Sequence, residues 1–207
     1  MSRASRSLLF ALLAAACASG GRVIGPPVGS GTLVDEFDRV ALGADWRVQS
    51  RGAAVIRTGD VSSASARLMI ATFVGRRFPA DQFSEVTSSA AFTNTGVRGI
   101  QIFVRRNEAT RQRYGFFLDN ATNRYHLKVD GGSPGVDLVD APAPALLQPN
   151  DVIRIEVSGD LLRGLVNGVE VLSVRDARLT GGQPGFVVNP TAVVPRVVGS
   201  WRGGGVP

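Results

Sequence analysis

Apolar and polar residues alternate along much of this 207-residue chain. The clearest case is Asp151–Ser158, where branched apolar residues occupy every second position. A period of two places successive side chains on opposite faces, so this segment predicts a strand with one buried face. Two further apolar runs, Leu161–Val166 and Val169–Val174, flank Asn167-Gly168. Both central residues of a type I′ turn need a positive φ, so Asn-Gly predicts a hairpin here and the three strands form an antiparallel meander.

The same alternation predicts about a dozen short strands, separated by turn residues about every 8–12 positions. We expect the other strands at 34–37, 46–48, 55–56, 67–72, 85–92, 97–105, 113–118, 124–129, 186–188 and 197–201. Three prolines predict a surface loop at Ala141–Pro149, and the run Gly203–Gly205 predicts a flexible tail. No segment has the period of 3.6 that a helix needs. The pattern therefore indicates an all-β, antiparallel two-sheet sandwich.

The N-terminal residues have the layout of a secretory signal. Arg3 and Arg6 precede an apolar run, Leu8–Ala16, that is shorter than the roughly 20 residues needed to cross a bilayer. Residues 1–16 are therefore predicted to be a signal peptide. Residues 17–32 are rich in Gly, Ser and Pro and predict a flexible tether, which leaves 33–204 as the folded domain.

Cys17 is the only cysteine and follows three alanines. This arrangement resembles the lipobox of bacterial lipoproteins, although Ala14 stands where leucine is commonest. The resemblance implies a diacylated Cys17 that holds the protein on the cell envelope, at the outer membrane of a diderm because Ser19 is not aspartate. Ala16-Cys17-Ala18 also fits ordinary signal-peptidase cleavage, so a secreted or periplasmic protein is the alternative.

Charge and composition argue against one class of partner. The formal net charge is +6, with 44% hydrophobic and 19% charged residues, as in a globular domain. Basic residues are interspersed with acidic ones, and they cluster only briefly at Arg76-Arg77 and Arg105-Arg106. Nucleic-acid binding requires a basic stripe with interleaved aromatic residues, which this chain lacks. We therefore expect no nucleic acid, and membrane contact only through the lipid.

Several short motifs carry a more specific resemblance. They are Asp35-Glu36-Phe37, Asn150–Val157, Val166-Asn167-Gly168, Gln183-Pro184-Gly185 and Trp201. In this order they resemble the concanavalin A-like lectin/glucanase superfamily, in its laminin-G-like jelly-roll branch, over residues 33–204. Asn150 departs from the glycine of the family motif. The resemblance implies a jelly roll whose first and last strands pair, a fold that hosts lectins, hydrolases and spacer modules alike.

Acidic residues bear on the choice among these functions. Glucanases of the superfamily carry Glu-x-Asp-x-Glu on one strand, and retaining chemistry needs two carboxylates about 5–5.5 Å apart. Here only Asp35, Glu36 and Asp38 cluster, and they match the structural first strand of the family. The sequence therefore favours a non-catalytic domain. A glycan-binding envelope lipoprotein is the first hypothesis, a protein-contact module of an envelope assembly the second, and a sugar-active hydrolase the third.

Glycan-binding members of the fold often use an exposed concave sheet, on which aromatic and polar side chains meet the sugar. Alternation on the middle strands places such side chains outward. The candidate carbohydrate-binding residues are Gln101, Phe103, Arg105, Phe117 and His126. An exposed pair of phenylalanines would indicate a contact surface. The alternative is that Phe103 and Phe117 are buried by the loop Ala141–Pro149.

Metal binding has weaker support. Many relatives hold calcium with loop carboxylates and carbonyls, and Asp35, Asp38, Asp130 and Asp137 are the candidate ligands here. No dense spacing of oxygen ligands is visible, which favours ordinary surface acids and no required cofactor. His126 is the only histidine, and without cysteines it cannot build a zinc site.

Overall fold

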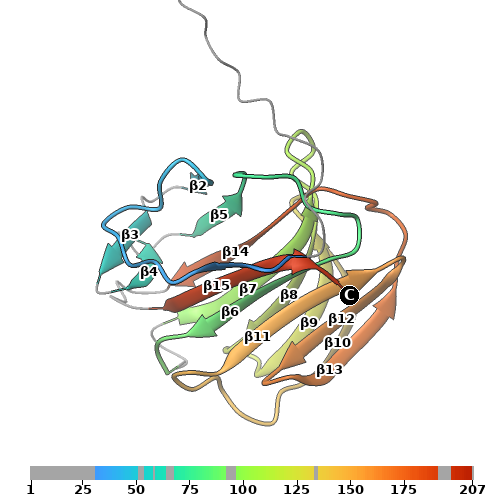
Figure 1. Ribbon diagram of the computed structural model, residues 1–207. Helices are drawn as coiled ribbons and strands as arrows, with labels where there is room; N and C mark the ends of the chain where they lie inside the picture. The colour runs from blue at the N-terminus through green and yellow to red at the C-terminus, as the bar shows by residue number, and fades with distance from the viewer. Residues whose placement is uncertain are drawn as a thin grey trace, which may run out of the picture.

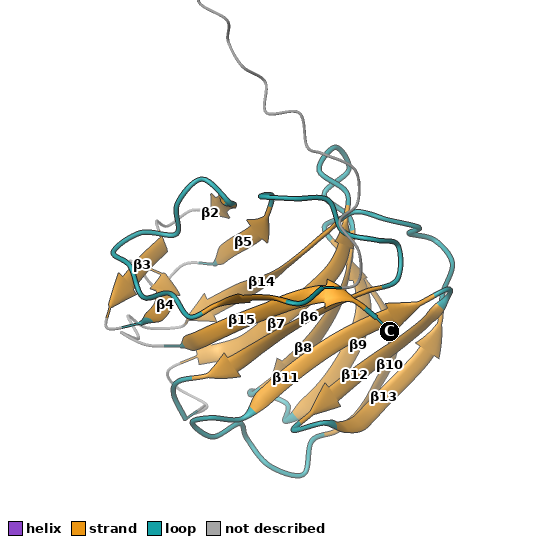
Figure 2. Ribbon diagram, in the orientation of Figure 1, coloured by secondary structure: helices purple, strands orange, loops and turns teal. Residues whose placement is uncertain are grey.

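The computed structural model describes residues 31–50, 54–57, 59–63, 68–91, 97–132, 135–190 and 197–206. Within these ranges the chain is strand, turn and loop, and none of it is helical (Figure 2). None of the described segments could cross a membrane as a helix. The predicted signal peptide, Cys17 and nearly all of the predicted tether lie outside the described residues.

The strands form two antiparallel sheets packed face to face (Figure 1). The β6 sheet has the order β13-β12-β11-β6-β15-β4-β3, with β1 also paired to β15, and the β7 sheet has the order β10-β9-β8-β7-β14-β5-β2. The strands are β1 Leu33–Asp35, β2 Trp46–Ser50, β3 Ala54–Arg57, β4 Asp60–Ser63, β5 Met69–Phe73, β6 Gln82–Ser88, β7 Val97–Arg106, β8 Arg113–Asp119, β9 Arg124–Asp130, β10 Val136–Pro142, β11 Val152–Ser158, β12 Leu161–Val166, β13 Val169–Arg175, β14 Gln183–Pro190 and β15 Val198–Gly205. This confirms the predicted two-sheet sandwich.

Local turn chemistry also agrees with the sequence. Strands β11, β12 and β13 pair in succession, as predicted for the meander. Asn167 and Gly168 both have positive φ, 51° and 78°, as a type I′ hairpin requires. Asn150, which replaces the glycine of the family motif, has φ 72°. Asparagine tolerates this left-handed conformation better than most residues, so the replacement keeps the turn.

The core between the sheets is anchored by aromatic rings from distant parts of the chain. The Trp201 indole stacks on Phe73 with ring centroids 5.1 Å apart, and Trp46 meets Trp201 edge-on at 4.9 Å. Trp201 is fully buried, and its Nε1 donates a hydrogen bond to Oγ of Ser84 at 3.0 Å. The last strand is thereby fixed to both sheets.

Two sequence expectations need correction. The predicted loop at Ala141–Pro149 is loop and turn from Ala143 onward, but the strand before it, β10, was not predicted and extends through Pro142. A register shift between Asp137 and Val139 interrupts the alternation of this edge strand, which hides it from pattern reading. The predicted flexible tail is also a strand, because Gly203–Gly205 pair with β6. A Cβ on Gly203 would fall 2.4 Å from Cζ2 of Trp201, so glycine is needed for the indole to pack.

Candidate functional site

The outer face of the β7 sheet carries large side chains that lie over glycines of neighbouring strands. A Cβ on Gly99 would fall 2.3 Å from Cε2 of Phe117, which shows that the phenyl ring covers Gly99. A Cβ on Gly115 would likewise fall 2.2 Å from Nε2 of Gln101. Glycine inside a strand often marks such a close approach. These two glycines let the neighbouring side chains lie flat.

A shallow cavity of about 240 Å³ opens on this face. Its lining residues come mainly from β14, β7, β8 and β9, and they are Leu68, Gly99, Gln101, Phe117, Lys128, Asp130, Val187 and Asn189. The wall therefore combines one aromatic ring with two amides, a cation and an anion. Such a mixture of apolar surface and a few polar groups is typical of small-ligand sites.

Three buried side-chain nitrogens on this outer face lack a hydrogen-bond partner among the described residues. They are Nε2 of Gln101, Nε of Arg113 and Nε2 of His126. The oxygen of the Gln101 amide does have a partner, because Oε1 accepts a hydrogen bond from Nη2 of Arg113 at 3.3 Å. Leaving a buried polar group unpaired costs about 1–3 kcal/mol. The amide of Gln101 also helps to lower the pKa of Asp130, so it lies beside that carboxylate at the wall of the cavity.

The charges at this site are fixed by one buried ion pair. Nη2 of Arg113 lies 2.6 Å from Oδ2 of Asp130, and the guanidinium lies 5.3 Å from the ring centroid of Phe103. Burial lowers the pKa of Arg113. Burial acts to raise the pKa of Asp130, but the charge of Arg113 and the N–H of Gly131 lower it more, and the pKa lies below its usual value. Asp130 is thus an ionised acceptor at neutral pH.

Three of the predicted binding residues form one row across the sheet. Gln101 of β7 is paired with Phe117 of β8, which is paired with His126 of β9. The rings of Phe117 and His126 lie 6.1 Å apart, and Nζ of Lys128 lies 5.0 Å from the centroid of Phe117. Nδ1 of His126 lies 3.5 Å from a carboxylate oxygen of Asp137. The row thus brings aromatic and polar groups together beside the cavity.

Phe103 belongs to the same face but is fully buried. A Cβ on Gly185 would fall 2.6 Å from its Cζ, and the Arg113 guanidinium covers its ring. The expected cover, the loop after β10, instead contributes Ala143 and Leu147 to the core between the sheets. Phe103 therefore lies beneath the candidate site, and residues other than the loop after β10 bury its ring.

Arg105 does not share this face, and its prediction as an outward residue was wrong. Arg105 has φ 51°, and the pairing of β7 with β14 shifts register at this point. Such a bulge reverses the side-chain alternation. The guanidinium instead donates to the carbonyls of Ala80, Leu179 and Gly159, where the strands of both sheets end. Arg106 takes the outward position and contacts Thr72 and Gln49.

The calcium hypothesis does not match the residues present. Asp35 accepts hydrogen bonds from Arg39 and Trp46, and Asp130 is paired with Arg113. Asp38 lies near Asp35, and Asp137 lies on β10, on the other sheet. In the described part of the chain no group of three or more His, Cys, Asp or Glu residues could hold a metal ion. The four candidate acids are therefore not gathered into one site.

The acidic first strand lines a cavity of about 630 Å³ together with Trp201 and Phe73. Burial acts to raise the pKa of Asp35, but hydrogen bonds from Arg39 and Trp46 lower it more, and the pKa lies below its usual value. A glycosidase acid needs the opposite shift, so that it holds a proton at neutral pH. Asp35 consequently has the environment of a structural carboxylate.

Comparisons with known proteins identify the architecture. No protein-family model matches the chain, and no curated protein matches it. Among solved structures, the carbohydrate-binding module CBM66 from Bacillus subtilis is 14% identical with a TM-score of 0.57, covering 74% of this chain and 93% of that one. The fold is that of the concanavalin A-like jelly rolls.

Two further structures share this jelly roll. The exoplasmic/lumenal domain of VIP36, in its Ca²⁺/Man-bound form, has a TM-score of 0.62 at 13% identity and covers 84% of this chain and 89% of its own. The Crh5 transglycosylase in complex with NAG has a TM-score of 0.57 at 12% identity and covers 87% and 86%. At these identities the likeness establishes the fold, which carries binding proteins and an enzyme alike.

Proposed function

We propose that this chain is an exported cell-envelope lipoprotein whose jelly roll binds a glycan on the outer face of the β7 sheet. The observation that carries the proposal is the 240 Å³ cavity itself, where the ring of Phe117 lies beside the amide of Gln101 and the ionised carboxylate of Asp130. The names of CBM66 and of mannose-bound VIP36 support carbohydrate as the ligand class.

The proposed binding mode assigns one task to each side chain. The apolar ring of Phe117 contacts a sugar ring face, because sugar C–H groups and aromatic faces are both poorly hydrated. The amide of Gln101 donates to a sugar hydroxyl oxygen, and the carboxylate of Asp130 accepts from a hydroxyl. Lys128 and Asn189 line the same cavity and offer further polar contacts. No covalent step is needed, and the domain acts as a binding module.

The anchor belongs to the same proposal. Lipid on Cys17 would keep the domain at a membrane surface through the tether, and two or more acyl chains suffice for stable anchoring. Mass spectrometry of the native protein tests this directly. We expect a mature chain that begins at a diacylated Cys17 and is released from membranes by Cys17→Ala. An unmodified mature chain that begins after Cys17 would refute the anchor and leave plain secretion.

A glycan array probed with the mature chain tests the ligand class. We expect binding to a limited set of polysaccharides, weakened about tenfold by Gln101→Leu, since one hydrogen bond contributes about 0.5–1.5 kcal/mol. Phe117→Ala should weaken binding further, whereas Gln148→Leu, in an exposed loop, is the matched control. A folded chain that binds no glycan would contradict the proposal and favour a protein-contact module.

A further inference from the structure

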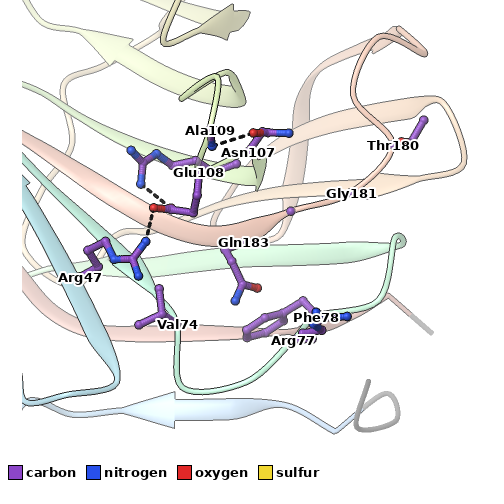
Figure 3. A pocket seen from close by; sticks show the side chains of 12 residues that line it. Arg47, Val74, Arg77, Phe78, Asn107, Glu108, Ala109, Thr180, Gly181 and Gln183 are labelled. Atoms are coloured by element: carbon purple, nitrogen blue, oxygen red, sulfur yellow. Dashed lines mark hydrogen bonds and ion pairs between the residues drawn. The ribbon is translucent and has the colours of Figure 1, made fainter. Parts of the chain in front are cut away.

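A second cavity, of about 570 Å³, opens at one end of the sandwich (Figure 3). It is bounded by β2, the β5–β6 connection, the β7–β8 turn and the β13–β14 connection. Its lining includes Arg47, Arg77, Phe78, Arg106 and Glu108. The volume falls within the range of cavities that hold small organic ligands, and it is larger than a single ion requires.

The charge of this cavity is strongly unbalanced. Three arginines line it, and Glu108 is the acidic residue among its lining residues. Glu108 is bonded to Nη1 of Arg47 at 2.6 Å and to Nη1 of Arg106 at 2.7 Å, so its carboxylate is shared by two guanidinium groups. Figure 3 shows Arg47 and Glu108 turned toward each other, with Phe78 and Arg77 across the cavity. The arginines therefore leave excess positive charge.

Two of these arginines retain unused donors. The Arg106 side chain is fully buried, and its Nε has no hydrogen-bond partner among the described residues. Burial lowers the pKa of Arg106, which shows that its charge is held in a poorly solvated place. Arg77 is exposed and makes no hydrogen bond or ion pair with another described residue. A guanidinium with free donors matches a carboxylate or phosphate in two-point geometry.

We propose that this cavity binds an acidic saccharide unit, whose anionic group is held by Arg77, with Arg47 and Arg106 adding to the positive charge of the cavity. Phe78, whose ring mostly packs in the core and lies 5.1 Å from the Arg76 guanidinium, offers its remaining exposed surface to the sugar. Gln183 keeps its Oε1 for a hydroxyl while its Nε2 donates to the carbonyl of Arg76 at 2.8 Å. An inorganic ion would use the charges but not the Phe78 surface. The inference rests on the proposed function in taking the ligand to be a saccharide.

The position of the cavity fits an extended ligand. Gln101 lines the first cavity and Arg106 the second, and both belong to β7. Five residues of strand correspond to roughly 16 Å at about 3.3 Å per residue. An oligosaccharide of a few units spans such a distance. The acidic unit would then occupy the end cavity while a neighbouring unit lies over Phe117.

Calorimetric titration of the mature chain with a trigalacturonate and with its uncharged methyl ester tests this inference. We expect the acid to bind at least tenfold more tightly, and we expect most of this preference to be lost in Arg77→Gln and at high salt. Arg175→Gln is the matched control, because Arg175 is an exposed arginine of β13 whose loss changes the net charge equally. Inorganic phosphate serves as the probe for a site that accepts any anion.

Each result decides the question. Equal binding of acid and ester, binding of neither, or a preference that survives Arg77→Gln would overturn the inference. Phosphate binding as tight as that of the trigalacturonate would also overturn it, since the sugar ring would then contribute nothing. Ester binding that depends on Phe117 but shows no preference for the acid would reject this inference alone and leave the proposed function intact.

Discussion

The carboxylate of Asp35 accepts a hydrogen bond from the indole Nε1 of Trp46 at 2.7 Å. Asp35 ends β1, which pairs with β15 of the β6 sheet, and Trp46 begins β2 of the β7 sheet. The same carboxylate is held by both terminal nitrogens of Arg39. One side chain therefore connects the two layers at the point where the chain crosses between them.

Acid should weaken this connection. The pKa of Asp35 is lowered in the folded state, so the stability that it contributes is present above the pKa of the unfolded chain, about 3.9, and is lost as pH falls through the folded value. Asp35→Asn should reduce the free energy of unfolding by about 1–3 kcal/mol at pH 7 and flatten its dependence below pH 4. Urea unfolding measures both effects. Asp160→Asn, at an exposed ion pair, should change stability by less than about 1 kcal/mol.

High pH should destabilise the protein by ionising the phenol of Tyr114. Burial and a hydrogen bond to Asp176 raise its pKa to about 12. The stability contributed by the protonated phenol is complete below the unfolded pKa, about 10, and disappears as pH rises through 12. Ultraviolet titration should show a late phenolate transition that Tyr114→Phe removes. A transition near pH 10 assigned to Tyr114 would contradict the observed burial.

Gly99→Ala should disturb the proposed binding face without touching its polar groups. The new methyl would displace the Phe117 ring, so we expect about 1–3 kcal/mol of lost stability and weaker glycan binding. Gly132→Ala is the control, because its Cβ would meet its nearest atom at an ordinary 3.6 Å. Unchanged binding in Gly99→Ala would show that the position of Phe117 does not matter to the ligand.

Arg105→Leu should strongly destabilise the fold. Strand alternation suggests that Arg105 points to solvent, but the side chain is buried. It would leave the carbonyls of Ala80, Leu179 and Gly159 without their donor. We expect a loss of about 2–5 kcal/mol in the free energy of unfolding. Arg124→Leu, which removes an exposed pair with Asp140, should cost under about 1 kcal/mol. Equal effects of the two substitutions would disprove the structural role.

The regular strands could be read from the sequence because alternation and turn residues agree there. Asn167-Gly168 and the apolar positions of β11 are local signals with local causes. Edge strand β10 and the glycines of β15 could not be read in this way. The structure of β10 depends on a register shift against β9, and that of β15 on its pairing with β6 and on the packing of Trp201 against Phe73, which lie far away in the chain.

The candidate site was predictable in part for the same reason. Alternation placed Gln101, Phe117 and His126 on one face, because the pairings of β7 with β8 and of β8 with β9 have no register shift. It failed at Arg105, where one extra residue reverses the alternation. Gly99 and Gly115 went unnoticed, although a glycine at a regular strand position is itself a signal of close approach.

The position of β15 in the β6 sheet constrains the order in which the protein can fold. β15 lies inside the β6 sheet, with β6 on one side and β1 and β4 on the other (Figure 1). The two halves of this sheet therefore cannot join until residues 198–205 are in place. A chain that emerges N-terminus first consequently cannot close its sandwich until residues 198–205 are free. Pairings so distant in sequence also form slowly. The topology thus makes closure of the β6 sheet wait for β15, whatever the order in which the other strands pair.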